Sequence, residues 1–151
     1  MFLIQSMEFK VFTQNPSETR KIGEILAREI SNPPKKIVIC LEGNLGGGKT
    51  TFIKGFAKGL GIREKILSPT FVIMRKFKLC NKKLNFFYHF DCYRIQNSAE
   101  ILKLGFKKII SDPKNIVVIE WANKIKNILP KNRITLNFRI IDKSKRKIVV
   151  K

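Results

Sequence analysis

One segment of eight residues constrains the fold of this chain more than any other: residues 43–50 read Gly-Asn-Leu-Gly-Gly-Gly-Lys-Thr. The segment matches the pattern G-x-x-x-x-G-K-[ST] in full. Its glycines let the backbone wrap closely around anionic oxygens, with the N–H groups pointing inward. A continuous apolar run, residues 37–41, precedes the segment, and a helical pattern, Lys49 to Leu60, follows it. A buried strand, a glycine-rich turn and a helix in this order predict a phosphate-binding loop (P-loop) in an α/β fold.

The chemistry expected of this P-loop follows from its residue types. The Lys49 ammonium group can reach the β- and γ-phosphates of a nucleotide, and the Thr50 hydroxyl can bind Mg²⁺. The helix that begins here adds the positive end of its dipole. The nucleotide-binding residues predicted from the loop are Gly43, Asn44, Leu45, Gly46, Gly47, Gly48, Lys49, Thr50 and Thr51.

The segment before the P-loop predicts a strand and then a helix. Residues 8–13 alternate polar and apolar side chains, as a half-buried strand does. Asn15 can cap the helix that follows, Pro16 suits its first position, and Glu18 completes a capping box. The sequence Asn32-Pro33-Pro34 ends this helix.

The segment after the P-loop helix contains patterns of both strands and helices. In order, these predict a hairpin of residues 70–79 and 84–90, a short helix at 98–103, a buried strand at 116–120 and a hairpin of residues 133–141 and 145–150. We therefore expect a P-loop NTPase-like, three-layer α/β fold with a mixed sheet, parallel in the centre and with antiparallel hairpins at its edges. Residues 1–151 are expected to form a single domain, with residues 1–6 as a disordered extension.

Two acidic residues follow apolar strand patterns. A P-loop that binds Mg²⁺ needs a carboxylate at the end of a neighbouring strand. Glu120 closes the apolar run at residues 116–119, and Asp91 closes the aromatic run at residues 86–90. An acid in such a position can instead cap the next helix, so the pattern alone leaves both interpretations open.

The formal charge of +20 has two interpretations. Clustered Lys and Arg attract phosphate backbones, which would indicate a nucleic-acid-binding protein. The alternative is compositional, because Lys, Ile and Asn are all abundant, as in proteins of AT-rich genomes. Lys residues are spread along the chain rather than gathered in one segment, which favours the compositional interpretation.

The cysteines and the hydropathy pattern indicate the cellular compartment of the protein. Cys40, Cys80 and Cys92 are odd in number and match no zinc or disulfide spacing, so we expect free thiols. No stretch of about 18 apolar residues indicates a membrane span. These patterns predict a cytoplasmic protein.

Four segments together carry a more specific signal. Besides the P-loop and its flanks, residues 41–52, the chain contains Ser68-Pro69-Thr70-Phe71, His89-Phe90-Asp91-Cys92-Tyr93-Arg94 and Ile119-Glu120-Trp121. The set resembles the TsaE family, small bacterial ATPases needed to make threonylcarbamoyladenosine in tRNA. The second segment is similar to that family's switch-like loop, and the last two resemble its H-F-D-x-Y-R and I-E-W signatures. The resemblance spans roughly residues 10–150, with departures at Asn44, Gly47 and Ala122, where the family usually has Asp, Ala and Pro.

The resemblance implies roles for individual residues. Lys49 and Thr50 would bind phosphate and Mg²⁺, and Glu120 would complete the metal site. Asp91 would position or activate the attacking water, so that the catalytic set is Asp91, Lys49 and Glu120. Thr19 and Arg146 match positions near the nucleotide.

Three further residues of the matching segments have less defined roles. His89, the only histidine, is expected to be a structural hydrogen-bonding residue rather than a general base. Trp121 could pack beside the metal site or serve only as a core residue. Arg94 could act on the phosphate from within the same chain.

At the level of function, the resemblance implies an ATP-binding accessory protein with weak, Mg²⁺-dependent ATPase activity. It would be required for threonylcarbamoyl modification of adenosine-37 in tRNA and would act with the TsaD and TsaB proteins. The tRNA would be contacted through that complex, and ATP would drive binding and release rather than supply the transferred group.

Two other functions are compatible with parts of the sequence. A P-loop small-molecule kinase would need an acceptor pocket and an arginine-bearing lid, whereas the segment between the P-loop helix and Glu120 reads largely as a hairpin. A non-catalytic RNA-binding protein would use the charge of +20 directly. Binding of unmodified tRNA that survives Lys49→Ala would favour this last alternative.

Overall fold

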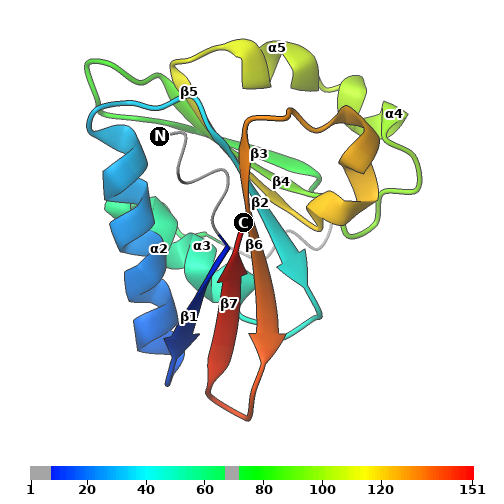
Figure 1. The fold of residues 1–151 in the computed structure, drawn as a ribbon. Coiled ribbons are helices and arrows are strands. Elements are labelled where there is room, and N and C mark those ends of the chain that lie inside the picture. Colours follow the sequence, from blue (N-terminus) through cyan, green and yellow to red (C-terminus); the bar gives the residue numbers. More distant parts are fainter. Residues whose placement is uncertain (1–7, 67–71) are drawn as a thin grey trace.

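The computed structural model describes residues 8–66 and 72–151, and all elements below lie in these two ranges. The strands of these ranges form one sheet in the spatial order β1-β7-β6-β2-β5-β4-β3 (Figure 1). Their bounds are β1 (Phe9–Thr13), β2 (Val38–Gly43), β3 (Met74–Lys78), β4 (Phe86–Asp91), β5 (Asn115–Glu120), β6 (Arg133–Ile140) and β7 (Arg146–Val150).

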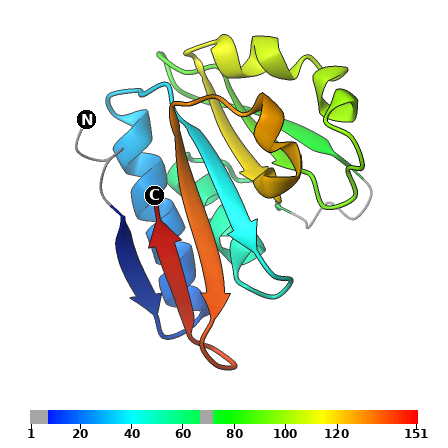
Figure 2. The ribbon, with the colours of Figure 1, turned by 45° about the vertical axis from the view of Figure 1, so that its right-hand side comes forward.

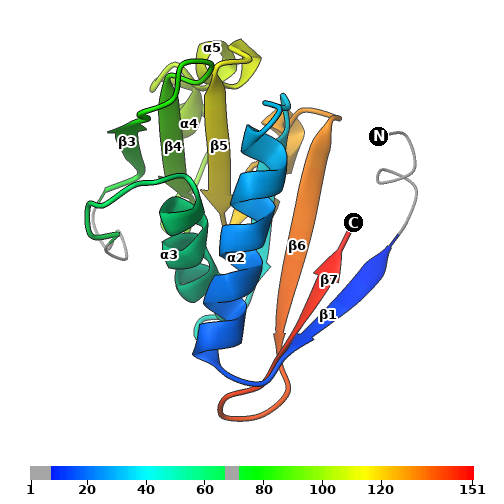
Figure 3. The ribbon, with the colours of Figure 1, turned by 90° about the vertical axis from the view of Figure 1, so that its left-hand side faces the viewer.

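Helices cover both faces of this sheet. Helices α2 (Pro16–Ser31) and α3 (Lys49–Gly59) lie side by side on one face, as Figure 3 shows. Helices α4 (Ala99–Leu102) and α5 (Phe106–Ser111) and the 3₁₀ helix η1 (Ala122–Ile128) lie on the other face (Figure 2). The expected three-layer α/β fold is thus confirmed. None of the helices in the described ranges is long and apolar enough to span a bilayer.

The direction of the strands also agrees with the expectation. In the centre, β2 runs parallel to both β5 and β6, and β4 runs parallel to β5. At the edges, β3 pairs with β4, and β7 pairs with β6 and β1, all antiparallel. Parallel strands end at the same edge of a sheet, so the P-loop after β2 and the acids that end β4 and β5 come together there.

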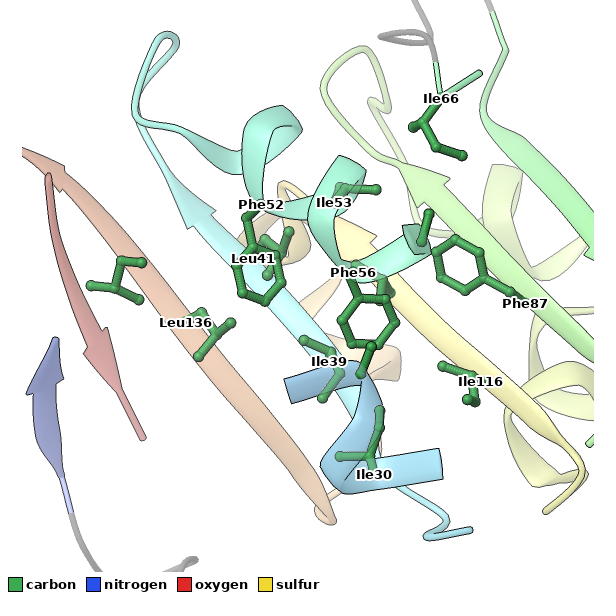
Figure 4. Packing of buried hydrophobic residues seen from close by; sticks show 14 of the residues in the cluster. Ile30, Ile39, Leu41, Phe52, Ile53, Phe56, Ile66, Phe87, Ile116 and Leu136 are labelled. Atoms are coloured by element: carbon green, nitrogen blue, oxygen red, sulfur yellow. The ribbon is translucent and has the colours of Figure 1, made fainter. Parts of the chain in front are cut away.

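The core under α2 and α3 holds the P-loop helix against the sheet. Phe52 and Phe56 of α3 are fully buried over Ile39 and Leu41 of β2 (Figure 4). The Phe56 ring lies 5.7 Å, centroid to centroid, from the ring of Phe87 on β4. Burial of each such side chain stabilises the fold by about 1.5–3 kcal/mol. This packing fixes the start of α3, and with it the P-loop, at the edge where the acids lie.

Glycines bring the backbones of α2 and α3 into contact. A Cβ atom added at Gly55 would lie 1.9 Å from the Arg20 carbonyl oxygen, and one at Gly23 would lie 2.2 Å from the Phe52 carbonyl oxygen. At Gly59 the distance to the Glu24 carbonyl oxygen would be 2.5 Å. No side chain fits between the helices at these points. The first turn of α2 is thereby placed beside the P-loop.

The start of α2 follows the capping prediction in part. The Asn15 side chain accepts a hydrogen bond from the Glu18 N–H at 2.9 Å, as expected. The Glu18 carboxylate, however, accepts from the N–H of Gln14 at 2.6 Å rather than from that of Asn15.

Other differences concern short elements and bounds. The patterns did not predict α5 or η1, so the segment between α3 and Glu120 contains short helices as well as the hairpin. Strand β3 is shorter than the predicted 70–79, and residues 70 and 71 lie outside the described ranges. The expected extension at residues 1–6 and the switch-like segment 68–71 also lie outside them.

Candidate functional site

A cavity of about 530 Å³ lies at the edge of the sheet where β2, β4 and β5 end. It brings together the P-loop, the first turn of α2, the segments after β4 and β5, and the β6–β7 turn. Its lining residues are Pro16, Thr19, Leu45, Gly46, Gly47, Gly48, Lys49, Thr50, Thr51, Val72, Ile73, Asp91, Tyr93, Arg94, Glu100, Glu120, Trp121, Ser144 and Arg146.

The P-loop is anchored to the sheet at its first residue. Gly43 pairs with Phe138 of β6 and has a φ of +131°, a conformation that L side chains rarely adopt. A Cβ atom at this position would lie 2.4 Å from the Phe138 carbonyl oxygen. The Gly47 N–H donates to the Asn44 carbonyl at 3.0 Å and closes the turn. Glycine is required at Gly43 for both its dihedral angle and the close approach of β6.

The first turn of α3 is built to receive an anion. Gly48 precedes the helix and supplies no side-chain cap, and the first turn contains no acidic residue. The first N–H groups of a helix have no partner within the helix, and its dipole is positive at this end. An anion bound in the loop would therefore meet N–H donors and a favourable potential.

The Lys49 side chain is buried, with 5% of the residue exposed. Its Nζ donates hydrogen bonds to the carbonyl oxygens of Gly43 and, at 2.9 Å, of Asn44. It also lies 4.3 Å from the centroid of the Trp121 ring. Burial lowers the pKa of Lys49 from its ordinary value, while the charges of Glu120 and Asp91 act in the opposite direction. Gly43 and Asn44 do not line the cavity. Their carbonyl oxygens instead hold the ammonium group of Lys49, which does line it.

Asp91 and Glu120 form the acidic side of the cavity. They are direct neighbours in the parallel register of β4 and β5. The Asp91 Oδ1 accepts a hydrogen bond from the Tyr93 N–H at 2.9 Å. Burial raises the pKa of Asp91, and the Glu120 charge adds to this; the Tyr93 hydrogen bond, His89 and Lys49 lower it.

Glu120 lies deeper than Asp91, with 3% of the residue exposed. Its Oε2 is 2.8 Å from Nε2 of His89, which is also buried. His89 thus has the structural hydrogen bond that was expected of it.

The oxygen donors around the cavity fit a hard divalent cation. The Thr50 hydroxyl and the carboxylates of Asp91 and Glu120 all line it, next to the P-loop. Mg²⁺ prefers oxygen ligands and is usually bound through one or two protein groups together with phosphate oxygens. The predicted metal residues, Thr50 and Glu120, are therefore brought to one place.

Thr19 and Arg146, which only the resemblance indicated, reach the P-loop from other elements. A Cβ atom at Gly48 would lie 3.6 Å from Cγ2 of Thr19 and 3.7 Å from Cγ of Arg146. The Thr19 hydroxyl is buried and bonds the Thr13 hydroxyl at 2.8 Å. Arg146 donates from Nη2 to the Gly46 carbonyl at 2.9 Å. Both residues line the cavity beside the loop.

Trp121 has an unusual backbone conformation. Its φ of +56° makes it the one non-glycine residue with positive φ in the described part of the chain. Such residues concentrate at functional sites, where surrounding contacts hold them in place. The Trp121 ring contacts the Lys49 ammonium group and also the ring of Tyr93, whose centroid is 5.1 Å away.

Several lining residues were not singled out from the sequence. Two of them, Glu100 and Ser144, come from segments that carry no phosphate-binding pattern. Glu100 caps the turn before α4, accepting from the N–H groups of Gln96 and Asn97 at 3.1 and 3.3 Å. Only the fold shows that these turns face the P-loop.

Comparisons with known proteins agree with this geometry. The family model described as "Threonylcarbamoyl adenosine biosynthesis protein TsaE" matches residues 13–148. A "tRNA threonylcarbamoyladenosine biosynthesis protein TsaE" from Bacillus subtilis is 38% identical over 129 residues, covering 85% of this chain and 76% of the relative. A protein of the same name from Rickettsia felis is 36% identical over 133 residues, covering 87% and 73%.

A solved structure gives the same result at the level of the fold. The crystal structure of YdiB from Bacillus subtilis superposes with a TM-score of 0.72 at 32% sequence identity. The match covers 95% of this chain and 84% of that chain.

Proposed function

The chain belongs to the TsaE family, and from this premise we propose that it is a Mg²⁺-dependent ATPase of low intrinsic activity. It would serve as an accessory protein in the threonylcarbamoyl modification of adenosine-37 in tRNA, together with TsaD and TsaB. One observation carries the proposal: residues 45–50 of the P-loop and two acids in direct strand register line the same cavity.

The phosphate tail of ATP would occupy the P-loop. The N–H groups of the loop and of the first turn of α3 would donate to its oxygens. Lys49 would turn from the carbonyls of Gly43 and Asn44 toward the β- and γ-phosphates. Thr19 and Arg146, which reach Gly48 from two sides, would border the rest of the nucleotide.

Thr50 and Glu120 would hold Mg²⁺ at the phosphates. When bound, the metal neutralises the charge that develops on the phosphate oxygens. Asp91 would accept a hydrogen bond from the attacking water and orient its oxygen toward the γ-phosphorus. The water oxygen would bond to that phosphorus as the bond to the β–γ bridging oxygen breaks, and the proton of the water would pass to a phosphate oxygen, so that ADP and inorganic phosphate result.

We expect slow turnover without partners because Arg146, one of the two arginines that line the cavity, is engaged by backbone carbonyls. Fast P-loop hydrolysis uses an arginine on the γ-phosphate as well as a well-placed water. Arg146 instead donates to the carbonyl of Gly46, and also to those of Asp142 and Lys145. We therefore expect TsaD and TsaB to raise the hydrolysis rate, with tRNA engaged through the complex.

Calorimetry with the purified chain tests the proposal. ATP is expected to bind, with higher affinity in Mg²⁺ than in EDTA, and GTP is expected to bind more weakly. Phosphate release should be slow for the chain alone and faster with TsaD, TsaB and tRNA. Absence of ATP binding in Mg²⁺ would refute the proposal. Tight tRNA binding by Lys49→Ala without partners would favour the RNA-binding alternative.

A further inference from the structure

His89 does not line the cavity but contacts Glu120, which does, and the proposed mechanism does not use its imidazole. It lies two residues before Asp91 on β4, so the two side chains are on the same face of the sheet. Its Nε2 is 2.8 Å from Oε2 of Glu120, and the two side chains are 0% and 5% exposed. The hydrogen bond therefore forms out of contact with water, directly beneath the acidic side of the cavity.

The partners of the ring indicate which nitrogen carries the proton. An ionised carboxylate can only accept a hydrogen bond, so Nε2 of His89 must be the donor. Among the described residues, Nδ1 has no hydrogen-bond partner. A neutral ring with its hydrogen on Nε2 leaves only a lone pair at Nδ1 and satisfies the contact with Glu120.

Packing alone does not explain a histidine at this position. The ring stacks on that of Phe87, with centroids 6.5 Å apart and planes inclined by 3°. A phenylalanine or leucine could fill the same space without burying an unpaired Nδ1. What the imidazole adds is a hydrogen-bond donor aimed at Glu120.

We propose that His89 is a positioning residue for the metal site. By donating from Nε2 to Oε2, it fixes the orientation of the Glu120 carboxylate and leaves Oε1 for the cation. Partners of this kind orient metal-binding side chains in many proteins, and their loss weakens metal binding. The inference rests on the proposed role of Glu120 as a Mg²⁺ ligand.

Three variants separate positioning from packing. His89→Leu removes the donor and keeps an apolar side chain, whereas His89→Gln retains an N–H donor of similar reach. Phe87→Leu is the matched control, because it removes the stacked ring but no contact with Glu120. ATP affinity is measured by calorimetry for each variant in EDTA and in Mg²⁺.

The expected result concerns only the gain in affinity that Mg²⁺ produces. His89→Leu should reduce this gain by about 10- to 100-fold, while His89→Gln and Phe87→Leu retain most of it. Affinity in EDTA should be nearly the same in all three. An equal loss in Phe87→Leu, or an undiminished gain in His89→Leu, would overturn the inference. A parent protein with no Mg²⁺-dependent gain would overturn the metal role of Glu120 itself.

Nuclear magnetic resonance gives a readout that needs no variant and no hydrolysis. The chain has a single histidine, so ¹⁵N-labelled histidine reports on His89 alone. We expect the tautomer protonated at Nε2, with a signal that shifts on adding ATP with Mg²⁺ and stays in place on adding ATP with EDTA. A ring protonated only at Nδ1, or a signal indifferent to Mg²⁺, would contradict the inference even if His89→Leu did not fold.

Discussion

The two sides of the cavity present their binding groups in different ways. The P-loop side uses a contiguous segment whose backbone N–H groups supply most of the hydrogen-bond donors, and Lys49 supplies one cation. The acidic side uses the carboxylates of Asp91 and Glu120, which come from separate strands and meet only through their register. A shift of either strand by one residue would turn its acid to the other face of the sheet and separate the pair.

The contrast indicates which part of the sequence determines each function. The P-loop side depends on local backbone conformation, so its changes should affect ATP binding with or without Mg²⁺. The acidic side depends on the alignment of two strands, so its changes should affect only the metal-dependent part or the rate. The following predictions test that division.

Replacement of Lys49 should have the largest effect. Lys49→Ala removes the ammonium group expected at the β- and γ-phosphates and should lower ATP affinity by about 100-fold or more, in Mg²⁺ and in EDTA alike. Calorimetry measures both values. Lys54→Ala, on the exposed face of α3, is the control and should bind ATP normally. If Lys49→Ala lost ATP affinity only in Mg²⁺, the proposed difference between the P-loop side and the acidic side would be wrong.

Replacement of Gly43 tests the anchor of the P-loop. The Cβ of Gly43→Ala would lie 2.4 Å from the Phe138 carbonyl oxygen at a φ of +131°, so β6 or the loop must move. We expect a loss of about 2 kcal/mol or more in the free energy of unfolding, measured in urea.

Gly46→Ala is the matched control for this measurement. Gly46 also has positive φ, at +76°, but no atom lies within 4 Å of an added Cβ. Gly46→Ala should lower the free energy of unfolding by only about 1 kcal/mol, which is the conformational penalty alone. Equal losses in the two variants would show that contact with β6 does not matter.

Replacement of Glu120 addresses the acidic side. Glu120→Ala removes a predicted Mg²⁺ ligand and should reduce the Mg²⁺-dependent gain in ATP affinity by about 100-fold, at least as much as the loss of its partner His89 does. Affinity in EDTA should change little, because no P-loop group is altered. Calorimetry in both conditions decides the matter, and hydrolysis at the parental rate would show the metal role to be wrong.

Replacement of Asp91 should give the smallest effect on the fold, and in an unusual direction. Burial raises the pKa of Asp91, so the folded protein holds this proton more firmly than the unfolded chain does. Stability therefore falls as pH rises from the ordinary aspartate range to the raised pKa, and the ionised group remains unfavourable above it. Asp91→Asn removes that penalty and keeps an acceptor for the Tyr93 N–H.

Thermal unfolding in EDTA tests this expectation. At about pH 7 the Tm of Asp91→Asn should exceed that of the parent by no more than about 2 °C, while ATP hydrolysis decreases. The difference should shrink as the pH is lowered into the ordinary aspartate range, because the parent carboxyl of the folded protein takes up its proton before that of the unfolded chain. A lower Tm for the variant at every pH would contradict the destabilising role of the buried charge.

The same division explains how far the sequence could be interpreted. The P-loop, the capped start of α2 and both hairpins were predicted because each depends on neighbouring residues. The acids were found as candidates, but their pairing needed the β4–β5 register. Likewise, Thr19 and Arg146 followed only from resemblance, since nothing local places them beside Gly48.

What was missed has physical reasons. Helix α5 has six residues, too few to display a helical period, and it begins after Gly105 in a left-handed conformation. The hydrogen bonds of Lys49 to the Gly43 and Asn44 carbonyls depend on the exact course of the loop. The unexpected partner of Glu18, the N–H of Gln14, likewise depends on the angle at which the chain enters α2.

The glycine contact between α2 and α3 has a mechanical consequence. The backbones of α2 and α3 are in contact at Gly23, Gly55 and Gly59, so we expect the two helices to move together as a rigid unit. A displacement of the P-loop end of α3 is then shared by α2. The buried bond between the Thr19 and Thr13 hydroxyls extends this linkage to the outermost strand, β1. An unbroken chain of contacts thus joins the P-loop end of α3 to the far rim of the sheet.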